Sequence, residues 1–449
     1  MLKFGTDGLR GVANSELTPE LALGLGRAAA RVLGGDRYAV GRDTRRSGPL
    51  LEAALSAGLA AEGADVVSLG VVPTPAVAWW SATTGSPAAM VSASHNPFGD
   101  NGIKLFSAGG RKLADDVEAA LEAELGRVLA GGWRRPSAPT GAALGTVSTD
   151  VSALAGYAGS VAASLAGRRL DGLRAVVDCA HGSASVVAPG VLRDLGVDVE
   201  VLHAEPDGTN INERCGSTHP GTLAAAVVAR GADVGVAFDG DADRVLLVDE
   251  MGTLIDGDQI IALCALDRHD RGVLPGDAVV VTVMTNLGFR LAMDKAGIGV
   301  VETAVGDRYV LEALESRGLA LGGEQSGHVI FRDLATTGDG LLTAVQVLDV
   351  VARAGWPLAA LAVEAMTRLP QVLRNVRVAE RDPYLLDRLA PAVAAVEARL
   401  GPSGRVLIRP SGTEPLVRVM AEAPTEAEAE AAVADLVAEV GRLVDPRRR

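Results

Sequence analysis

The feature that most constrains the fold is a pattern of predicted strands and helices that occurs three times along the chain. In each copy an apolar strand is followed by a helix, a glycine that can end the helix, and a second strand. The expected first strands begin at Tyr38, Arg174 and Val279, the helices span 50–62, 184–195 and 289–296, and the glycines are Gly63, Gly196 and Gly297. Strand, helix and strand at this spacing form βαβ units with a right-handed crossover and a largely parallel sheet. The sequence therefore predicts three related α/β domains.

Each copy ends in a polar loop between two apolar strands. The loops are SASHN at 92–96, DGDAD at 239–243 and GEQSG at 323–327. Open α/β sheets place ligands at the carboxyl ends of such strands. We expect the three domains to direct one loop each towards a shared cleft.

Composition shifts mark the predicted domain boundaries. The linkers are expected at 131–149, 250–257 and 369–371, which divides the chain into 1–150, 151–250, 251–370 and 371–449. The first domain opens with a helix that starts after Thr18 and ends at Gly34, and the second with a helix over 151–165. The last part differs: strands at 372–378, 406–409 and 416–420 alternate with a helix over 383–400 and a final helix with a capping box, Thr425 and Glu428. This pattern predicts a small α+β domain.

Charge and cysteine usage exclude several classes of protein. A net charge of -14 leaves no general basic face for nucleic acid or an anionic membrane, although local Arg and Lys can bind a small anion. Cys179, Cys215 and Cys264 are odd in number and lack metal-ligand spacing, which favours buried, reduced thiols and a cytoplasmic location. No apolar run approaches about 18 residues, and the start of the chain lacks a signal pattern. A homodimer is compatible with the sequence, which does not fix the oligomeric state.

The loop after the apolar strand Ala88 to Val91 presents a nucleophile and a cation. Pro97 and its neighbouring glycines force a turn, so Ser94 is expected at its tip. His95 adds a hydrogen-bonding group, and Lys104 can reach back over the turn. Taken alone, the segment is also typical of an ordinary polar turn.

Three carboxylates follow the next buried strand at every second position: Asp239, Asp241 and Asp243. Crowded anions need a cation, and an all-oxygen set suits Mg²⁺, which also binds a substrate phosphate oxygen. A calcium loop of the EF-hand kind shares this spacing. However, Arg244 stands where that loop needs glycine, and strands flank the segment. We predict one Mg²⁺ site, with a structural acidic turn as the alternative.

Three further segments carry groups suited to sugars and phosphates. Glu324 and Ser326 suit sugar hydroxyls, and His328 is a candidate for proton transfer, although a single histidine is more often structural. The loop RPSGTEP at 409–415, with Arg418 beyond it, combines phosphate-binding groups, and a hydrogen-bonded turn is the alternative. Arg10, in FGTDGLRG, either contacts an anion or only opens the first strand.

Together these loops describe phosphoryl transfer. The chain has no G-x-S-x-G motif, and His95 is poorly placed, as an immediate neighbour, to be the base of Ser94, which argues against acyl transfer. A phosphorylated Ser94 would contribute an oxygen to the Mg²⁺ shell. Its charge would be balanced by the cation and by nearby Lys and Arg.

Six motifs resemble, in order, those of the α-D-phosphohexomutase superfamily: FGTDGLRG, SASHNP, DNGIK, DGDADR, GEQSGH and RPSGTEP. The resemblance spans essentially the whole chain. It implies four domains, three of related α/β topology and a fourth that closes over the active site. The opening G-T-D-G and the last loop resemble the glucosamine branch, whereas relatives of the mannose and glucose type typically carry R-x-S-N-T there.

The resemblance also implies roles for individual residues. Ser94 would be the phosphoserine and would bind Mg²⁺ together with Asp239, Asp241 and Asp243, while Glu324 and Ser326 would hold sugar hydroxyls. The distal phosphate would be held by Arg409, Ser411, Gly412, Thr413 and Arg418. The residues that match positions near the reacting groups are Arg10, His95, Lys104, Arg244 and His328. One departure is Ala242, where the superfamily usually has glycine; alanine fits if its φ is negative, and we expect it to be tolerated.

The implied activity is the interconversion of glucosamine 6-phosphate and glucosamine 1-phosphate, a step towards UDP-N-acetylglucosamine and cell-wall precursors. Glucosamine 1,6-bisphosphate would be the intermediate and activator. The nearest rival is a mutase of mannose or glucose phosphates. A catalytically silent sugar-phosphate sensor is a second rival, but a sensor needs neither Ser94 nor the three aspartates.

Overall fold

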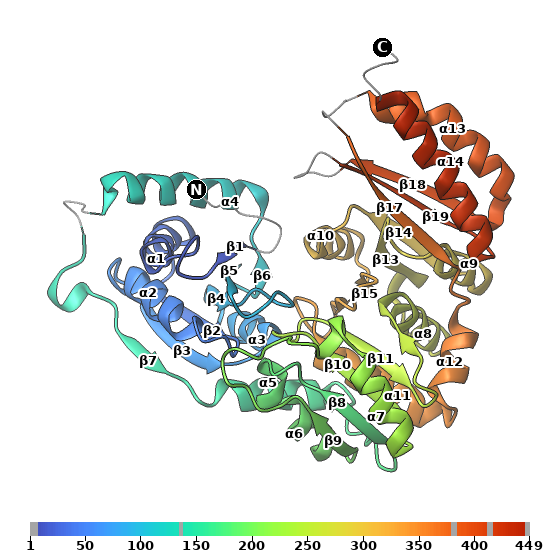
Figure 1. Ribbon diagram of the computed structural model, residues 1–449. Coiled ribbons are helices and arrows are strands. Elements are labelled where there is room, and N and C mark those ends of the chain that lie inside the picture. Colours follow the sequence, from blue (N-terminus) through green and yellow to red (C-terminus); the bar gives the residue numbers. More distant parts are fainter. Residues whose placement is uncertain (1–7, 134–137, 379–383, 411–415, 445–449) are drawn as a thin grey trace. The chain divides into compact units, whose positions relative to one another are not determined.

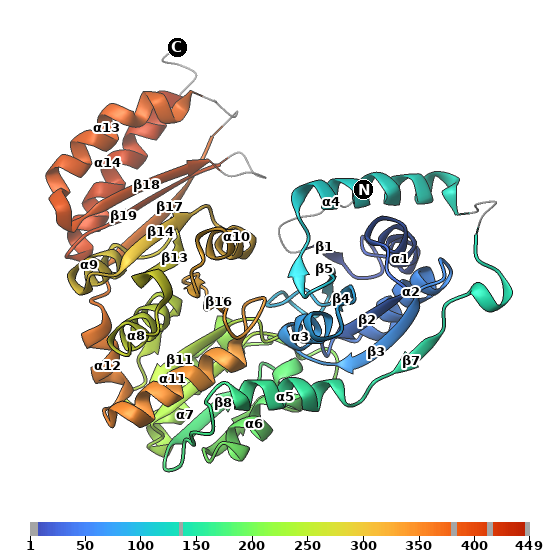
Figure 2. The same ribbon diagram turned by 180° about the vertical axis from the view of Figure 1, so that it is seen from behind.

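The computed structural model describes residues 8–133, 138–378, 384–410 and 416–444. The chain divides into two compact units, and each is described by itself (Figures 1 and 2). The larger unit contains 1–284 and 298–364, and the smaller contains 285–297 and 365–449. The four-domain division at 150, 250 and 370 stays a prediction.

The first sheet of the larger unit carries the Ser94 loop. Its strands lie in the order β1 (Leu9–Val12), β5 (Asp100–Ser107), β4 (Ala88–Val91), β2 (Arg37–Arg42), β3 (Asp65–Val71) and β7 (Val147–Thr149), and β6 (Arg111–Lys112) pairs with β5. The strands from β4 to β7 run parallel, whereas β1, β5 and β4 pair antiparallel. Register places Met90 opposite Lys104. Lys104 therefore lies on β5, the strand that follows the Ser94 turn.

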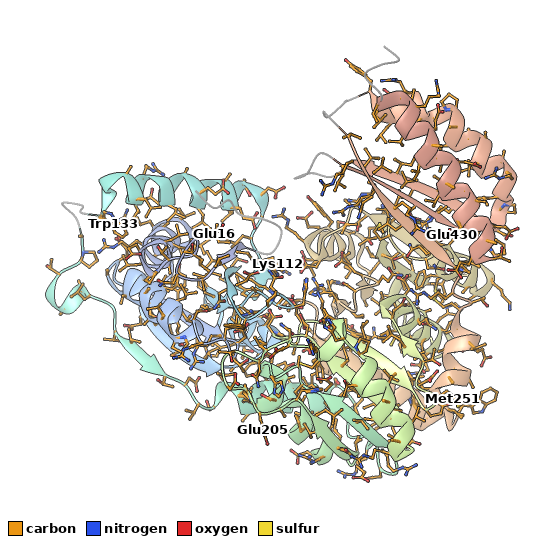
Figure 3. The ribbon with its side chains drawn as sticks, viewed as in Figure 1. Glu16, Lys112, Trp133, Glu205, Met251 and Glu430 are labelled. Atoms are coloured by element: carbon orange, nitrogen blue, oxygen red, sulfur yellow. The ribbon has the colours of Figure 1, made fainter. Side chains whose placement is uncertain are left out.

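Helices cover both faces of this sheet. The helices are α1 (Pro19–Leu33), α2 (Gly48–Ala60), α3 (Thr74–Thr84) and α4 (Asp115–Arg127). Buried residues of α1, α2 and α4, such as Leu25, Leu55 and Leu121, form one core with Val40 and Val91 of the strands. On the opposite face α3 packs so closely that a Cβ on Gly41 would lie 2.6 Å from Val77. The guanidinium of Arg27, on α1, lies over the ring of Trp133, which is labelled in Figure 3.

The second sheet carries the aspartate loop. Its order is β12 (Leu254–Ile255), β11 (Val245–Asp249), β10 (Val234–Phe238), β8 (Arg174–Asp178) and β9 (Asp198–Leu202). Strands β8, β9 and β10 are parallel, while β10 and β11 form an antiparallel pair. The helices of this part are α5 (Ala153–Ala163), α6 (Ala188–Asp194) and α7 (Gly221–Arg230). Leu223 and Val227 of α7 pack on Val176, Ala237 and Val248.

The third sheet carries the GEQSG loop. Its order is β14 (Gly299–Thr303), β13 (Ala278–Thr282), β15 (Leu321–Gly323) and β16 (Val329–Phe331), with the last two strands antiparallel. Helices α8 (Gly257–Asp270), α10 (Asp307–Arg317), α11 (Gly340–Ala354) and α12 (Leu358–Ala365) belong to this part. Among the described residues, no single helix has the length and apolar composition to cross a membrane, although the bent pair α11 and α12 has both together.

In its described residues, the smaller unit is an antiparallel sheet with three helices. Its strands lie in the order β17 (Gln371–Arg377), β19 (Leu416–Glu422) and β18 (Arg405–Pro410), and α9 (Leu287–Ala296), α13 (Leu385–Leu400) and α14 (Glu426–Val444) complete it. Leu389 of α13 and Leu436 of α14 join Val419 of the sheet in one core. The predicted capping box is confirmed: Thr425 Oγ1 accepts from the N–H of Glu428, and Glu428 accepts from the N–H of Thr425. The predicted helix start at Pro383 lies outside the described residues.

The α/β prediction is confirmed, with local corrections. The helix expected over 184–195 is wrong: a short 3₁₀ turn at Ser183–Val186 is followed by α6, because Pro189 has no N–H to continue one helix through both. The expected cap at Gly63 is confirmed: Gly63 has a left-handed φ of 95°, its N–H donates to the Ala60 carbonyl at 3.0 Å, and the N–H of Ala64 donates to the Leu59 carbonyl at 3.3 Å. Helix α3 was not expected, because it is apolar on nearly every side and shows no amphipathic period.

Candidate active site

Ser94 lies in the turn between β4 and β5, fully buried and with a left-handed φ of 53°. Such a φ is strained for a residue with a Cβ and is typical of functional positions. The Ser94 hydroxyl donates to Asp239 Oδ2 at 2.6 Å, and its N–H donates to Ser92 Oγ at 2.9 Å. The strained turn therefore aims the serine oxygen at the aspartate loop of the second sheet.

A buried guanidinium holds the backbone of this turn. Arg45 is 1% exposed, pairs with Asp43 at 2.9 Å, and donates to the carbonyls of Ser94 at 2.9 Å and Asn96 at 2.8 Å. It also donates to the carbonyls of Pro97 and Asp100. The side-chain amide of Asn212 donates to the same Ser94 carbonyl at 2.9 Å. The carbonyls of the turn are thus satisfied from two directions.

The three aspartates lie between β10 and β11, all buried, with one oxygen of each within 4.8 Å of the others. Lys104 Nζ contacts Asp241 Oδ2 at 2.7 Å and Asp243 Oδ2 at 3.1 Å. Thr74, at the start of α3, donates to Asp241 Oδ2 at 2.6 Å. Strands rather than helices flank the loop, which confirms that it is not a calcium loop of the EF-hand kind.

The electrostatics of this cluster call for a further cation. Burial, and then the charges of Asp243 and Asp241, raise the pKa of Asp239 well above its usual range. Burial opposes ionisation of Asp243 too, but Lys104, His328 and Arg244 hold its pKa well below the usual value. Asp241 Oδ1 and Asp243 Oδ1 are buried and accept no hydrogen bond from a described residue. An oxygen-only set with unused lone pairs fits a hard divalent ion.

The backbone of the aspartate loop corrects one expectation. Ala242 has a φ of 56°, in the left-handed region, so the negative φ on which the fit of alanine was made to depend is not found. The conformation is held by tertiary contacts: the N–H of Gly340, the first residue of α11, donates to the Ala242 carbonyl at 3.0 Å. Those contacts offset the cost of a left-handed alanine, on the order of 1 kcal/mol.

Two arginines and a histidine surround the serine. His95 Nδ1 lies 3.3 Å from Ser94 Oγ, and burial, together with the charges of Arg244 and Arg10, lowers the His95 pKa. The N–H of Arg244 donates to Asp239 Oδ1 at 3.2 Å, and its Nε lies 3.7 Å from Asp243 Oδ1. The side chain of Arg10 crosses Gly102, where a Cβ would lie 3.1 Å from it. His95 thus lies beside the serine and Arg244 beside the aspartates, and the charge of Arg10 acts on His95.

The GEQSG loop is joined to the aspartate loop through the backbone. The N–H of Val245 donates to the Gly327 carbonyl at 3.1 Å. Glu324 is half-buried and accepts from the N–H of Gly306 at 3.0 Å, whereas Ser326 is exposed. This connection places the loop with Glu324 next to the carboxylate cluster.

His328 lies behind the carboxylates. Its ring is buried between Asp243 at 3.8 Å and Asp307 at 3.3 Å. Burial alone would lower its pKa, but the two carboxylates raise it. Lys112, labelled in Figure 3, pairs with Asp307 from the other side.

The fourth predicted loop belongs to the smaller unit. Arg409 on β18 is paired in register with Arg418 on β19, so both side chains leave the same face of the sheet. Arg418 is exposed and Arg409 half-buried. Ser411, Gly412 and Thr413 lie outside the described residues.

Comparison with known proteins places the whole chain in one family. Family models for phosphoglucomutase/phosphomannomutase match along its length: alpha/beta/alpha domain I at residues 1–129, domain II at 155–252, domain III at 256–369 and the C-terminal domain at 373–440. The chain belongs to the phosphoglucomutase/phosphomannomutase family. It is accordingly an enzyme, an isomerase of the phosphohexomutase superfamily, as the motifs predicted.

Relatives in this family match from end to end. The phosphoglucosamine mutase of Frankia casuarinae is 56% identical over 99% of this chain and 99% of its own length. That of Moorella thermoacetica is 54% identical over 96% of this chain and 98% of its own. A crystal structure of a phosphoglucomutase/phosphomannomutase family protein from Burkholderia thailandensis, 27% identical, covers 98% of this chain and 97% of its own with a TM-score of 0.81.

Sequence reasoning missed several residues of this mutase-family site. Asp43 and Arg45 follow the carboxyl end of β2. The other site loops were predicted from the same position after a strand, so this rule could also have identified these two residues. Thr74 starts a helix that was not expected. Asn212 lies in the long connection 203–220, where no periodic pattern points to a role.

Proposed function

We propose that the chain interconverts glucosamine 6-phosphate and glucosamine 1-phosphate, with Ser94 as the phosphoryl carrier. The observation that carries the proposal is the 2.6 Å contact between the Ser94 hydroxyl and Asp239, at the edge of a buried carboxylate cluster with unused oxygens. The glucosamine substrate rests on the names of the relatives that are 54–56% identical over nearly the full chain.

Ser94 would accept a phosphoryl group from glucosamine 1,6-bisphosphate and return it to the sugar. Asp239 Oδ2 accepts the hydroxyl hydrogen of Ser94 and so orients the oxygen that forms the new bond. Arg45 and Asn212 keep the turn from relaxing out of its left-handed conformation. Arg10, His95 and Arg244 would neutralise charge on the transferring phosphoryl group.

One Mg²⁺ would be held by Asp239, Asp241, Asp243 and an oxygen of the phosphorylated Ser94. When bound, it supplies neutralisation of the charge on the phosphoryl oxygens. Lys104 holds Asp241 and Asp243 in place from the adjacent strand. His328, fixed between Asp243 and Asp307, would serve the same loop from behind.

The remaining loops would hold the substrate. Glu324 and Ser326 would bind sugar hydroxyls. Arg409 and Arg418 are like charges directly opposite each other on antiparallel strands, an unfavourable pairing that a bound phosphate would relieve. With Ser411, Gly412 and Thr413 they would form the clamp for the distal phosphate, and domain 371–449 would be the lid.

The cellular setting is proposed on chemical grounds. Three buried, unpaired cysteines support a reducing, cytoplasmic location. The acidic net charge of -14 supports a small sugar phosphate as partner rather than nucleic acid or a membrane.

The test follows phosphate on the protein and turnover in the same samples. We expect the intact mass of the full chain to increase by one phosphoryl group after incubation with glucosamine 1,6-bisphosphate, and Ser94→Ala to show neither the increase nor turnover. The rate should fall by at least about 10⁴-fold, as for other lost nucleophiles. Ser92→Ala, the matched control, should still be phosphorylated.

Substrate choice is tested with a panel of sugar phosphates in both directions. We expect glucosamine phosphates to have the highest kcat/KM. A higher kcat/KM for mannose or glucose phosphates would establish the hexose-mutase rival instead. Binding of the sugar phosphates without turnover or phosphorylation would establish the sensor.

A further inference from the structure

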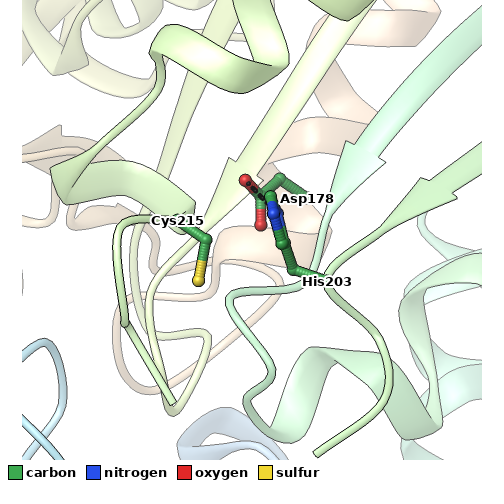
Figure 4. Close-up of side chains that lie close together, drawn as sticks. All are labelled: Asp178, His203 and Cys215. Atoms are coloured by element: carbon green, nitrogen blue, oxygen red, sulfur yellow. Dashed lines mark ion pairs between the residues drawn. The ribbon is translucent and has the colours of Figure 1, made fainter. Parts of the chain in front are cut away.

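We propose that Asp178, His203 and Cys215 form a second metal site, which takes one thiophilic divalent cation of the Zn²⁺ class. The three side chains come from separate segments: the last residue of β8, the residue after β9, and the residue before the 3₁₀ turn Gly216–Thr218 (Figure 4). Their donor atoms lie within 4.8 Å of one another. The ligands of a tetrahedral Zn²⁺ lie about 3.3 to 3.7 Å apart, so only a small contraction is needed.

The carboxylate of this cluster is held in a fixed orientation. The N–H of Ala180 donates to Asp178 Oδ1, and the N–H of Gly216 donates to Asp178 Oδ2, both at 2.9 Å. Fixed ligand orientation is what a metal site obtains from its surroundings. The Gly216 bond also ties the residue next to Cys215 to the end of β8.

The imidazole of His203 lies beside the Asp178 carboxylate with a ring nitrogen that could bind a metal ion. His203 Nδ1 is buried and lies 3.0 Å from Asp178 Oδ2, yet it forms no hydrogen bond with a described residue. The side chain as a whole is 26% exposed, which gives an ion a route from solvent. The His181 ring packs against it in a T-shaped arrangement with centroids 5.3 Å apart, and water would supply the fourth ligand.

The thiol completes a donor set that differs in kind from the aspartate loop. Cys215 is fully buried and forms no disulfide, and burial beside Asp178 raises its pKa to about 12. Binding therefore breaks the S–H bond, forms a sulfur–metal bond and releases the proton to solvent. One oxygen, one nitrogen and one sulfur favour Zn²⁺ or Co²⁺ over Mg²⁺, which prefers oxygen alone.

Hydrogen bonds connect the segments of this cluster to the Ser94 turn and to the aspartate loop. The N–H of Asn212 donates to the Ala180 carbonyl at 2.9 Å, while its side chain donates to Ser94. The N–H of Ser183 donates to the Gly240 carbonyl at 2.9 Å. An ion at Asp178, His203 and Cys215 would therefore join the segments that hold the Ser94 turn and the aspartate loop.

The test uses Co²⁺ as the probe, because cobalt bound to a thiolate absorbs in the near ultraviolet. The full-length protein is stripped of metal, saturated with Mg²⁺ to occupy the aspartate loop, and titrated with Co²⁺. We expect one equivalent to produce the thiolate band, and Zn²⁺ to abolish it by displacement. Absence of the band in the wild-type protein would overturn the proposal and leave the three residues as a hydrogen-bonded structural cluster.

Matched variants assign the site. Cys215→Ser should lose the band, whereas Cys264→Ser and Cys179→Ser, which remove the other buried thiols, should keep it. A band that survives Cys215→Ser would overturn the assignment. If Cys215→Ser does not fold, His203→Gln decides, because that side chain is partly exposed: at least a tenfold weaker Co²⁺ affinity supports the site, and unchanged affinity overturns it.

Discussion

The Ser94 turn and the aspartate loop use nearly the same backbone device but differ in how their polar groups are satisfied. Each contains a left-handed residue other than glycine, Ser94 at 53° and Ala242 at 56°. The carbonyls of the Ser94 turn are capped by Arg45 and Asn212. In the aspartate loop, by contrast, Asp241 and Asp243 each retain a buried oxygen with no hydrogen bond from a described residue.

The two arrangements suit two different tasks: the first holds a hydroxyl in a fixed position, and the second leaves oxygens available to bind a cation. A reactive hydroxyl needs a fixed backbone, and a buried guanidinium with its own counter-ion provides one permanently. The proposed metal loop needs carboxylate oxygens without hydrogen-bond donors, since a fixed donor there would compete with the ion. Lys104 balances part of the charge and leaves room for an exchangeable cation.

The largest effect is expected when the permanent cation of the Ser94 turn is removed. Arg45→Met leaves Asp43 buried without its partner and uncaps the carbonyls of the turn. We expect a loss of about 3 to 5 kcal/mol in the free energy of unfolding. Urea unfolding measures it, with the exposed neighbour Arg46→Met as the control, expected within about 0.5 kcal/mol of wild type. Equal effects of the two variants would show that the turn does not depend on Arg45.

The second prediction concerns the support of the aspartate loop. Asp339 caps α11, whose first N–H holds Ala242, and burial raises the pKa of Asp339 to about 6. Because the folded-state pKa is raised, its stabilising contribution is present below pH about 4 and lost as the pH rises through about 6. Asp339→Asn cannot ionise. The unfolding free energy of wild type should therefore fall by about 3 kcal/mol relative to the variant across that window.

Urea unfolding of both proteins at a series of pH values measures this difference. Asn keeps an oxygen for the N–H of Leu342, so the cap itself is preserved. A difference that does not change with pH would mean that Asp339 stays ionised in the folded protein.

The third prediction contrasts the two cations. Lys104→Met removes charge balance from Asp241 and Asp243, and an added ion can replace that balance. We expect Mg²⁺ at about 100 times its Kd to restore about 2.7 kcal/mol of unfolding free energy to Lys104→Met. The same Mg²⁺ should add no more to Arg45→Met than to wild type. Thermal unfolding of both variants with Mg²⁺ and with EDTA measures this stabilisation. If Mg²⁺ stabilised Arg45→Met and not Lys104→Met, the prediction would be wrong.

The smallest effect concerns the strained alanine. Ala242→Gly relieves the left-handed strain, partly offset by the greater freedom of glycine in the unfolded chain, so we expect a gain of about 0.5 kcal/mol. The midpoint of urea unfolding measures it. Ala237→Gly, in the preceding strand, should instead destabilise. A loss at both positions would show that packing of the Ala242 methyl outweighs its strain.

The repeated α/β units, the helix caps at Thr18 and Thr425, and the three loops at strand ends could all be predicted from the amino-acid sequence. These features depend on hydrophobic period and on turn and cap chemistry, which act over a few neighbouring residues. That is also why Ser94, Asp239, Asp241 and Asp243 could be singled out before any contact was known.

Which side chains contact one another could not be predicted in this way and depends on the packing of the folded chain. Lys104 reaches Asp241 across 137 residues, and Asn212 reaches Ser94 across 118. Asp178, His203 and Cys215 converge although their spacing resembles no metal motif. The sign of φ at Ala242 was likewise set by α11 and not by its own residue type. Such contacts follow from which strands pair and in what register, and spacing along a chain does not encode that when the partners lie in different sheets.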